Sequence, residues 1–166
     1  MNRPTITDLA KAAGVSISTV NRLLHGSTAV RQDTIDQILK AAEEIGFYGL
    51  GTIKDRRREA MPHHRLGFLM QQSHRPLYRL WAEGIIAAAR QRPDSIIEPD
   101  VVFEDDLSPE AVSANLLKMG QSCSAIAVVT ADHPLVSQAI DELRGRGVPV
   151  VTYVSDLSAA SRAGFV

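Results

Sequence analysis

The side chains most able to do chemistry gather in one short run of this 166-residue sequence, AGVSISTVNRLLHG from Ala13 to Gly26. Within this run we expect Val20, Leu23 and Leu24 to face inward, and we expect Ser18, Asn21 and Arg22 to face outward. A serine hydroxyl can donate or accept a hydrogen bond, and a guanidinium can donate two parallel hydrogen bonds to one partner. Packing alone does not require such an outer face, so the surrounding elements must show what it touches.

Three short helices are predicted around this run. Thr5 and Asp8 form the S/T-x-x-D/E pattern of a capping box, which begins the first helix. Gly14 provides a tight turn, and Ser16 caps the second helix. A third helix covers about Gln32 to Ile45, where apolar residues recur at helical spacing. Three helices around one small core form the minimal helix-turn-helix domain.

A helix-turn-helix domain places its second helix in the major groove of DNA, with the first residues of that helix at the base edges. There, Arg22 can form a bidentate pair with guanine, Ser18 can donate or accept, and Ile17 can pack on a thymine methyl group. Hydroxyls near helix N-termini, such as those of Thr5 and Ser16, suit phosphate oxygens. The alternative is a merely solvated face, which explains Arg22 alone better than it explains the full array of caps, turn and third helix.

Composition limits the classes of function. The formal net charge of −1 argues against a general polyanion binder, but residues 1–65 carry +3 and residues 66–166 carry −4. This asymmetry suggests that the basic N-terminal part alone meets an anionic partner. No apolar run reaches the roughly 18 residues of a membrane span, and the polar N-terminus does not resemble a signal peptide. The single cysteine, Cys123, excludes a disulfide framework, predicts a buried position and fits a reducing cytoplasm.

The second half of the chain alternates between strands and helices. Between Phe47 and Arg65 the helical periodicity fails in a mixture of glycine, proline and charge, which indicates a linker or a marginal helix. The predicted strands are RLGFLM, IIEPDVVF, AIAVV and VPVVTYV, separated by helices over about 77–92, from Ser108 and Pro109, and from Asp132 and Pro134. This β-α-β-α-β-α-β pattern predicts a parallel sheet with right-handed crossovers and helices on both faces.

The run TITDLAKAAGVSISTVNRLLHGSTAV, from Thr5 to Val30, resembles the N-terminal signature of the LacI/GalR family of bacterial transcription regulators. The resemblance implies an all-α helix-turn-helix head at 1–47, a hinge at 48–64, and part of an α/β, periplasmic-binding-protein-like effector domain at 65–166. It implies a cytoplasmic homodimer, or a dimer of dimers, that is nucleoid-associated when bound to a pseudopalindromic DNA operator. Repression of sugar or small-metabolite genes is expected, and activation stays open because the sign of regulation depends on where the operator lies. A small-molecule effector, such as a sugar, would control it. Neither a cofactor, a metal, a membrane nor a catalytic residue is expected.

The family motif also implies which residues meet DNA. Base contacts are expected from Ile17, Ser18 and Arg22. Contacts to the DNA backbone are expected from Thr5, Ser16, Thr19, Asn21, His25 and Arg31. Three of these, Asn21, His25 and Arg31, depart from the residues usual in the family. Arg31 precedes the third helix where Ser or Thr usually caps, and an arginine cannot cap in that way, although it can reach a phosphate.

The hinge departs most from the family pattern, in which a leucine wedges into the minor groove. Arg56 stands where that leucine is expected. Either the side chains of Arg56, Arg57 and Arg58 enter a narrow minor groove electrostatically, or Leu50 or Ile53 supplies the wedge from a shifted register. A solvated basic linker that touches only phosphates is the third interpretation.

Effector contacts are expected beyond the carboxyl ends of the strands, where open α/β sheets bind ligands. The candidates, which can bind the hydroxyls of a sugar or polyol, are Gln72, His74, Asp106, Asp132, His133 and Asp156. Asp132 is also expected to cap the following helix in part, and Trp81 to pack in the core. The family sensor has two such subdomains with the effector between them, so we expect the α/β domain to be incomplete.

Two other classes of protein stay open. An α/β enzyme with an accessory helical domain would recruit Asp105, Asp106, Asp132 and His133 as acid, base or metal ligands. The sequence has no G-x-S-x-G, P-loop, H-E-x-x-H or complete glycine-rich fingerprint to support it. The other class is a sensor whose helical head binds a protein. Such a head would not bind DNA, and its binding to the partner would not depend on salt concentration.

Overall fold

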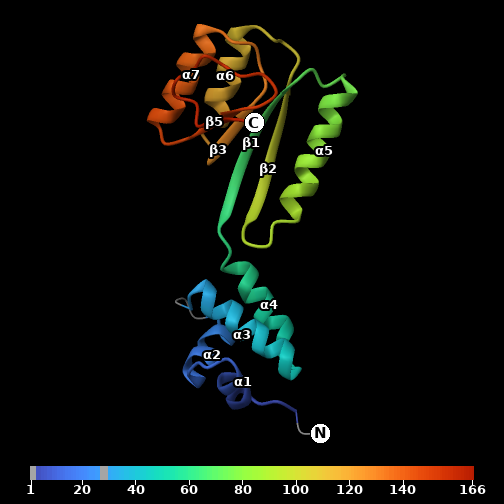
Figure 1. Ribbon diagram of the computed structural model, residues 1–166, viewed down its shortest axis with the longest axis vertical. Coiled ribbons are helices and arrows are strands. Elements are labelled where there is room, and N and C mark those ends of the chain that lie inside the picture. The colour runs from blue at the N-terminus through green and yellow to red at the C-terminus, as the bar shows by residue number, and fades with distance from the viewer. Residues whose placement is uncertain (1–2, 27–29) are drawn as a thin grey trace. The chain divides into compact units, whose positions relative to one another are not determined.

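The computed structural model describes residues 3–26 and 30–166 and divides into two compact units, Met1–Pro62 and His63–Val166 (Figure 1). We call the first unit the head and the second the sheet unit. Ser27, Thr28 and Ala29, near the end of the family-like run, lie outside the described residues. Four helices make up the described part of the head: α1 (Ile6–Ala12), α2 (Ile17–Leu24), α3 (Gln32–Ile45) and α4 (Leu50–Glu59).

Local hydrogen bonds fix where the head helices begin and turn. The capping box is complete, because the Asp8 N–H donates to the Thr5 hydroxyl and the Thr5 N–H donates to the Asp8 carboxylate. Ser16 caps α2 by accepting from the N–H of Thr19 at 3.1 Å. The turn between α1 and α2 holds Gly14 at φ 64°, a left-handed conformation that suits glycine. The predicted helix-turn-helix is confirmed.

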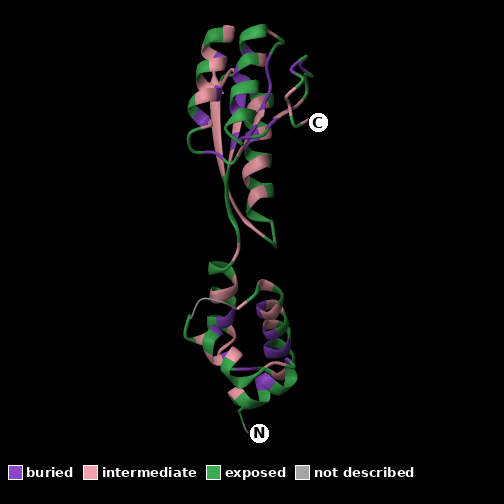
Figure 2. Cartoon of the chain, turned by 90° about the vertical axis from the view of Figure 1, so that its left-hand side faces the viewer, coloured by how far each residue is buried: buried purple, intermediate pink, exposed green. Residues whose placement is uncertain are grey.

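The head has its own apolar core, visible as the buried residues in Figure 2. Leu9, Val20 and Ile38 are fully buried in it and come from α1, α2 and α3. Because these side chains belong to one buried cluster, they hold the three helices together. The outer face of α2 is thereby presented on a rigid support.

The segment predicted as a linker or a marginal helix is a helix, α4, that packs on the head. Ile53 is 0% exposed within the head core, and Leu50 packs against the same cluster. Burying one isoleucine side chain contributes about 1.5–3 kcal/mol. The head core therefore extends beyond residue 47, and α4 contacts both α2 and α3.

The sheet unit is built on a five-stranded parallel sheet with strand order β2-β1-β3-β4-β5. Its strands are β1 (His63–Gln71), β2 (Ile96–Glu104), β3 (Ala125–Val128), β4 (Val150–Thr152) and β5 (Gly164–Phe165). The four predicted strands and the parallel sheet are confirmed, and the short β5 is an addition that the sequence did not predict. Its two residues offer too little pattern to signal a strand.

Three helices connect these strands: α5 (Pro76–Arg90), α6 (Pro109–Met119) and α7 (Pro134–Gly145). The chain passes from β1 outward to β2 and then back across β1 to β3 and β4. Right-handed crossovers therefore place α5 on one face and α6 and α7 together on the other (Figure 1). Leu116, Ile126 and Ile140 are buried between the sheet and the α6–α7 layer. Cys123 is a buried free thiol in this core, as predicted.

No helix among residues 3–26 and 30–166 is both long and apolar enough to cross a membrane. The same described ranges hold no group of three or more His, Cys, Asp or Glu side chains that could hold a metal ion.

Candidate nucleic-acid interface and strand-edge residues

Helix α2 has one buried and one exposed face. Val20 is 0% and Leu23 4% exposed, whereas Ile17 is 46% exposed. Ser18 and Arg22 are also exposed. The three residues expected to contact bases therefore share the outer face of one helix whose inner face is anchored in the head core. The structure brings together the side chains that the spacing predicted.

A network of hydroxyls orders the first turn of α2. The Ser16 Oγ lies 2.8 Å from the Ser18 Oγ and 2.8 Å from the Thr19 Oγ1. The Arg22 Nε donates to the Ser18 carbonyl at 3.4 Å, which aligns the guanidinium along the helix. Hydrogen-bond donors at a helix N-terminus suit an anionic oxygen, and here three hydroxyls stand together on one exposed turn.

The remaining expected backbone contacts are spread around the head. Thr5 begins α1, where its hydroxyl donates to Asp8 at 2.7 Å, so it is not part of the α2 hydroxyl network. His25 ends α2, and its Nδ1 lies 2.8 Å from the carbonyl of the half-buried Asn21. An Nδ1–H that donates to this carbonyl leaves Nε2 for another partner. Arg31 precedes α3 and makes no side-chain cap bond, as the sequence predicted.

The hinge residues are engaged within the head. Ile53 is fully buried, so in this conformation it cannot insert between base pairs, and the wedge interpretation does not fit it. Leu50 is half-buried against the same core. Arg56 pairs with Glu59 at 2.6 Å, and Arg57 pairs with Asp36 of α3 at 2.5 Å. A solvated linker does not fit either, because α4 is held by both apolar and ionic contacts.

The expected effector residues do lie at the carboxyl ends of the strands, but most are engaged locally. The Asp106 carboxylate accepts from the Ser108 N–H at 2.9 Å, and this bond lowers the pKa of Asp106. Asp156 forms an ion pair with Arg162 at 2.8 Å. His74 is exposed, and Gln72 follows β1 with a positive φ of 40°. Asp106 and Asp156 thus shape loops at this edge of the sheet.

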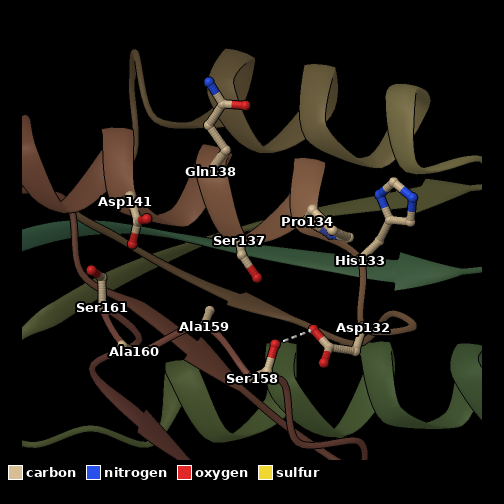
Figure 3. Close-up of a pocket in the computed structure, with 10 residues that line it drawn as sticks. All are labelled: Asp132, His133, Pro134, Ser137, Gln138, Asp141, Ser158, Ala159, Ala160 and Ser161. Carbon is tan, nitrogen blue, oxygen red and sulfur yellow. Dashed lines mark hydrogen bonds between the residues drawn. The ribbon is translucent and has the colours of Figure 1, made fainter.

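The expected cap of α7 was assigned to the wrong residue. His133 is the N-cap, and its Nδ1 accepts from the Leu135 N–H at 3.2 Å. Asp132 instead accepts from the Ser158 hydroxyl at 3.1 Å, a contact drawn in Figure 3. Ser158 follows β4, so this interaction joins two segments that are distant in sequence, and local spacing could not reveal it.

Asp132 and His133 line an open depression of about 600 Å³ between α7 and the loop after β4 (Figure 3). Sequence reasoning missed its other polar lining residues, which are Ser137, Gln138, Asp141, Ser158 and Ser161. Ser137 and Asp141 are four residues apart on one helix, so helical periodicity is the signal that could have found them.

An aromatic cluster also lies at the carboxyl ends of β1 and β4. Trp81 of α5 contacts Tyr78 with ring centroids 5.5 Å apart and Tyr153 with centroids 6.3 Å apart. The Tyr153 hydroxyl is 3.5 Å from the Leu69 carbonyl, and burial raises the pKa of Tyr153. Trp81 is half-buried, so the expectation of a core position is met only in part.

Backbone strain marks the same edge. Val154, directly after Tyr153, has a φ of 69°, and the N–H of Ser155 donates across it to the Tyr153 carbonyl at 2.8 Å. A β-branched residue in this region costs free energy, and such strain often occurs at functional sites.

Comparison with known proteins finds a family match within the head. Residues 5–49 match the family described as bacterial regulatory proteins, lacI family. The HTH-type transcriptional regulator GalR of Lacticaseibacillus casei is 49% identical over 57 residues, which cover 33% of this chain and 15% of GalR. The HTH-type transcriptional regulator reg1 of Streptomyces lividans is 29% identical over 165 residues, which cover 97% of this chain and 45% of reg1. The chain thus spans less than half the length of these relatives.

Solved structures align with lower identity. A Lac repressor dimer bound to operator and the anti-inducer ONPF aligns over 99% of this chain and 48% of its own, with 18% identity and a TM-score of 0.44. A complex of the transcriptional regulator CelR with cellobiose aligns over 91% of this chain and 43% of its own, with 21% identity and a TM-score of 0.33.

Proposed function

We propose that this chain, whose residues 5–49 match the family described as bacterial regulatory proteins, lacI family, is part of a transcription regulator that binds a DNA operator through α2. The observation that carries the proposal is the exposed face of α2, on which Ile17, Ser18 and Arg22 stand together above a buried face. The relatives it matches are transcription regulators, and we propose no catalytic role.

Each residue of this face has a distinct task in the proposed complex. Arg22 bonds the O6 and N7 atoms of a guanine, Ser18 bonds a neighbouring base edge, and Ile17 contacts a thymine methyl group. The hydroxyls of Ser16 and Thr19 are already ordered 2.8 Å apart, so they reach a phosphate at little further entropic cost. Of the other expected backbone contacts, we retain Thr5, Asn21, His25 and Arg31 as phosphate contacts.

Dimerisation is proposed through α5. Leu77 is 52% and Leu80 64% exposed, and Gly84, Ala87 and Ala88 continue this apolar stripe along the exposed side of the helix. The small residues of this stripe allow a second helix to approach closely, and the two leucines supply apolar surface to bury against it. A two-fold dimer then presents two copies of α2 to a pseudopalindromic operator.

A small-molecule effector is proposed at the carboxyl edge of the sheet. The hydroxyl-binding side chains there, together with the strained backbone at Val154 and the aromatic cluster, support a sugar or related polyol as its chemical class. Gln72, His74, Asp132 and His133 remain the residues proposed to contact it, and such a protein would act in the bacterial cytoplasm.

Selection of bound sequences from random DNA duplexes tests the proposed function. We expect a two-fold symmetric consensus, in which the Arg22→Ala chain loses its preference for guanine at one position per half-site. The loss of discrimination is about 1–3 kcal/mol, which corresponds to a factor of roughly 5 to 150.

Lys40→Ala is the matched control, because Lys40 is an exposed cation on a different helix, α3. It should leave the consensus unchanged while removing the same charge. Failure to enrich any sequence, or an unchanged consensus for Arg22→Ala, would count against the proposal.

A further inference from the structure

The guanidinium of Arg56 lies against Gly26, the glycine that follows the end of α2. A Cβ atom placed on Gly26 would lie 2.7 Å from the Cζ and Nη2 atoms of Arg56 and 2.8 Å from its Nη1 atom. Because the three distances are nearly equal, the plane of the guanidinium faces the space that a side chain would fill. Gly26 also has a φ of 72°, so both its backbone conformation and this contact favour a glycine.

Two contacts of α4 hold Arg56 in this place. Ile53, one turn earlier on the same face of α4, is fully buried in the head core. The Nη1 atom of Arg56 donates to the Glu59 carboxylate at 2.6 Å, and 32% of the Arg56 side chain is exposed. The arginine is therefore anchored on α4, and the flat side of its guanidinium is turned to the end of α2.

The last turn of α2 is a favourable place for a cation. The carbonyls at the C-terminus of a helix carry a partial negative charge, which a nearby positive charge stabilises. Arg22, the residue proposed to bond a guanine, belongs to this last turn and stands four residues before Gly26. A shift of the turn therefore moves the side chain on which the proposed base contact depends.

We propose that Arg56 is a positioning residue for DNA recognition: packed on Gly26, it fixes the last turn of α2, so that Arg22 presents its guanidinium to a base in one orientation. The inference rests on the proposed function, since it assumes that α2 contacts DNA. Arg56 does not need to touch the duplex for this role. An arginine suits the role because its planar group covers the face of a glycine, whereas the compact ammonium of a lysine does not.

Binding of the full chain to two duplexes tests this role. One is the operator selected with the wild-type chain, and the other has adenine in place of the guanine for which Arg22→Ala loses its preference. We expect Arg56→Gln to reduce the ratio of the two affinities about three- to tenfold, which is part of the discrimination carried by Arg22. The dependence of affinity on salt should keep its slope. Arg56→Lys should behave like Arg56→Gln, because it keeps the charge and loses the plane.

A direct contact between Arg56 and a phosphate predicts a different result. Loss of Arg56 would then lower the salt slope by about one and weaken binding to both duplexes alike, and Arg56→Lys would restore both properties. That result, or an unchanged ratio of affinities in Arg56→Gln, overturns the positioning role. Lys40→Gln is the matched control, because it removes one exposed cation of the head from α3 and should leave the ratio unchanged.

A double-mutant cycle with Gly26→Ala isolates the contact itself. The strain of an alanine at a φ of 72° is the same whichever residue occupies position 56. The clash of the alanine Cβ with the guanidinium exists only when Arg56 is present. Gly26→Ala should therefore lower the ratio of affinities by a smaller factor in the Arg56→Gln background than in the wild-type chain, and equal factors overturn the inference.

Hydrogen exchange without DNA separates this inference from the proposed function. The amides of His25 and Gly26 donate to the carbonyls of Asn21 and Leu23. Arg56→Gln should accelerate their exchange about two- to fivefold relative to Lys40→Gln, while the amides of α1 stay protected. Unchanged exchange overturns the inference whether or not DNA is bound. If the wild-type chain selects no duplex but exchange is still accelerated, the proposed function fails, and Arg56 is shown to fix the end of α2 without a base contact to position.

Discussion

Replacing Ile53 with alanine tests whether α4 belongs to the head. The side chain is 0% exposed and packs in the cluster formed by α1 to α4. Truncating a buried isoleucine to alanine costs about 2–5 kcal/mol, made up of the lost transfer free energy and the cavity left behind. A small domain of this size has roughly 3–9 kcal/mol of stability, so the substitution removes a large part of it.

Hydrogen exchange measured by mass spectrometry gives the free energy of opening for each helix. In Ile53→Ala we expect the amides of α4 to exchange at least about thirtyfold faster, because 2 kcal/mol corresponds to that factor. Trp81, the single tryptophan of the sequence, lies in the sheet unit, so its fluorescence reports the stability of that unit separately. That signal should not change.

Thr52→Ala is the control for this experiment, since Thr52 is an exposed residue of the same helix. Alanine favours a helix more than threonine does, so exchange in α4 should stay equal or slow down. If Ile53→Ala and Thr52→Ala behave alike, or if α4 already exchanges at the rate of an unstructured chain, the packing of α4 on the head is refuted.

Three further predictions concern pH and packing. The Asp8 carboxylate accepts from the Thr5 N–H and hydroxyl, and these bonds lower the pKa of Asp8. The stability that the ionised carboxylate gives the head is complete above the pKa of the unfolded chain, about 4, and is lost as the pH falls further. Asp8→Asn should therefore make the unfolding free energy of the head depend less on pH in this acid range. Gly67→Ala places a Cβ 2.7 Å from the Met119 Cε and should lower the urea-unfolding free energy of the sheet unit by about 1–3 kcal/mol; an unchanged value would mean that the core has room. Burial raises the pKa of Tyr153. The stability that its neutral hydroxyl gives the sheet unit is therefore complete below about pH 10 and is lost as the pH rises above that value. Tyr153→Phe should remove this loss of stability at alkaline pH, and an unchanged loss in the variant would contradict the role given to Tyr153.

The helix caps of both units could be predicted because their signals are local. Thr5 with Asp8, Ser16 and Ser108 are hydroxyl caps at the expected positions, and the structure confirms all three. Each cap depends on residues within three positions along the chain, which a sequence displays directly. The outer face of α2 follows from the same helical spacing.

The packing of α4 could not be predicted because its cause is distant. Ile53 stands in a segment of glycine and charged residues. No neighbouring residue indicates that the core formed by α1, α2 and α3 has space for the Ile53 side chain. Likewise, the spacing of Asp132 and Pro134 suggested a cap, but Ser158 binds the Asp132 carboxylate after the fold brings the two loops together. Contacts between residues distant in sequence therefore decide which role a residue takes when its local sequence permits more than one.

The two cores share no residue among those described, and the chain between them is exposed. Trypsin would meet Arg58 at the end of α4 and Arg65 in the exposed start of β1, and cleavage there would separate pieces that each retain a core. The same property matters for evolution. Gene recombination at this joint would attach the sheet unit to a different head without a single change in either interior, so the two units can diverge independently.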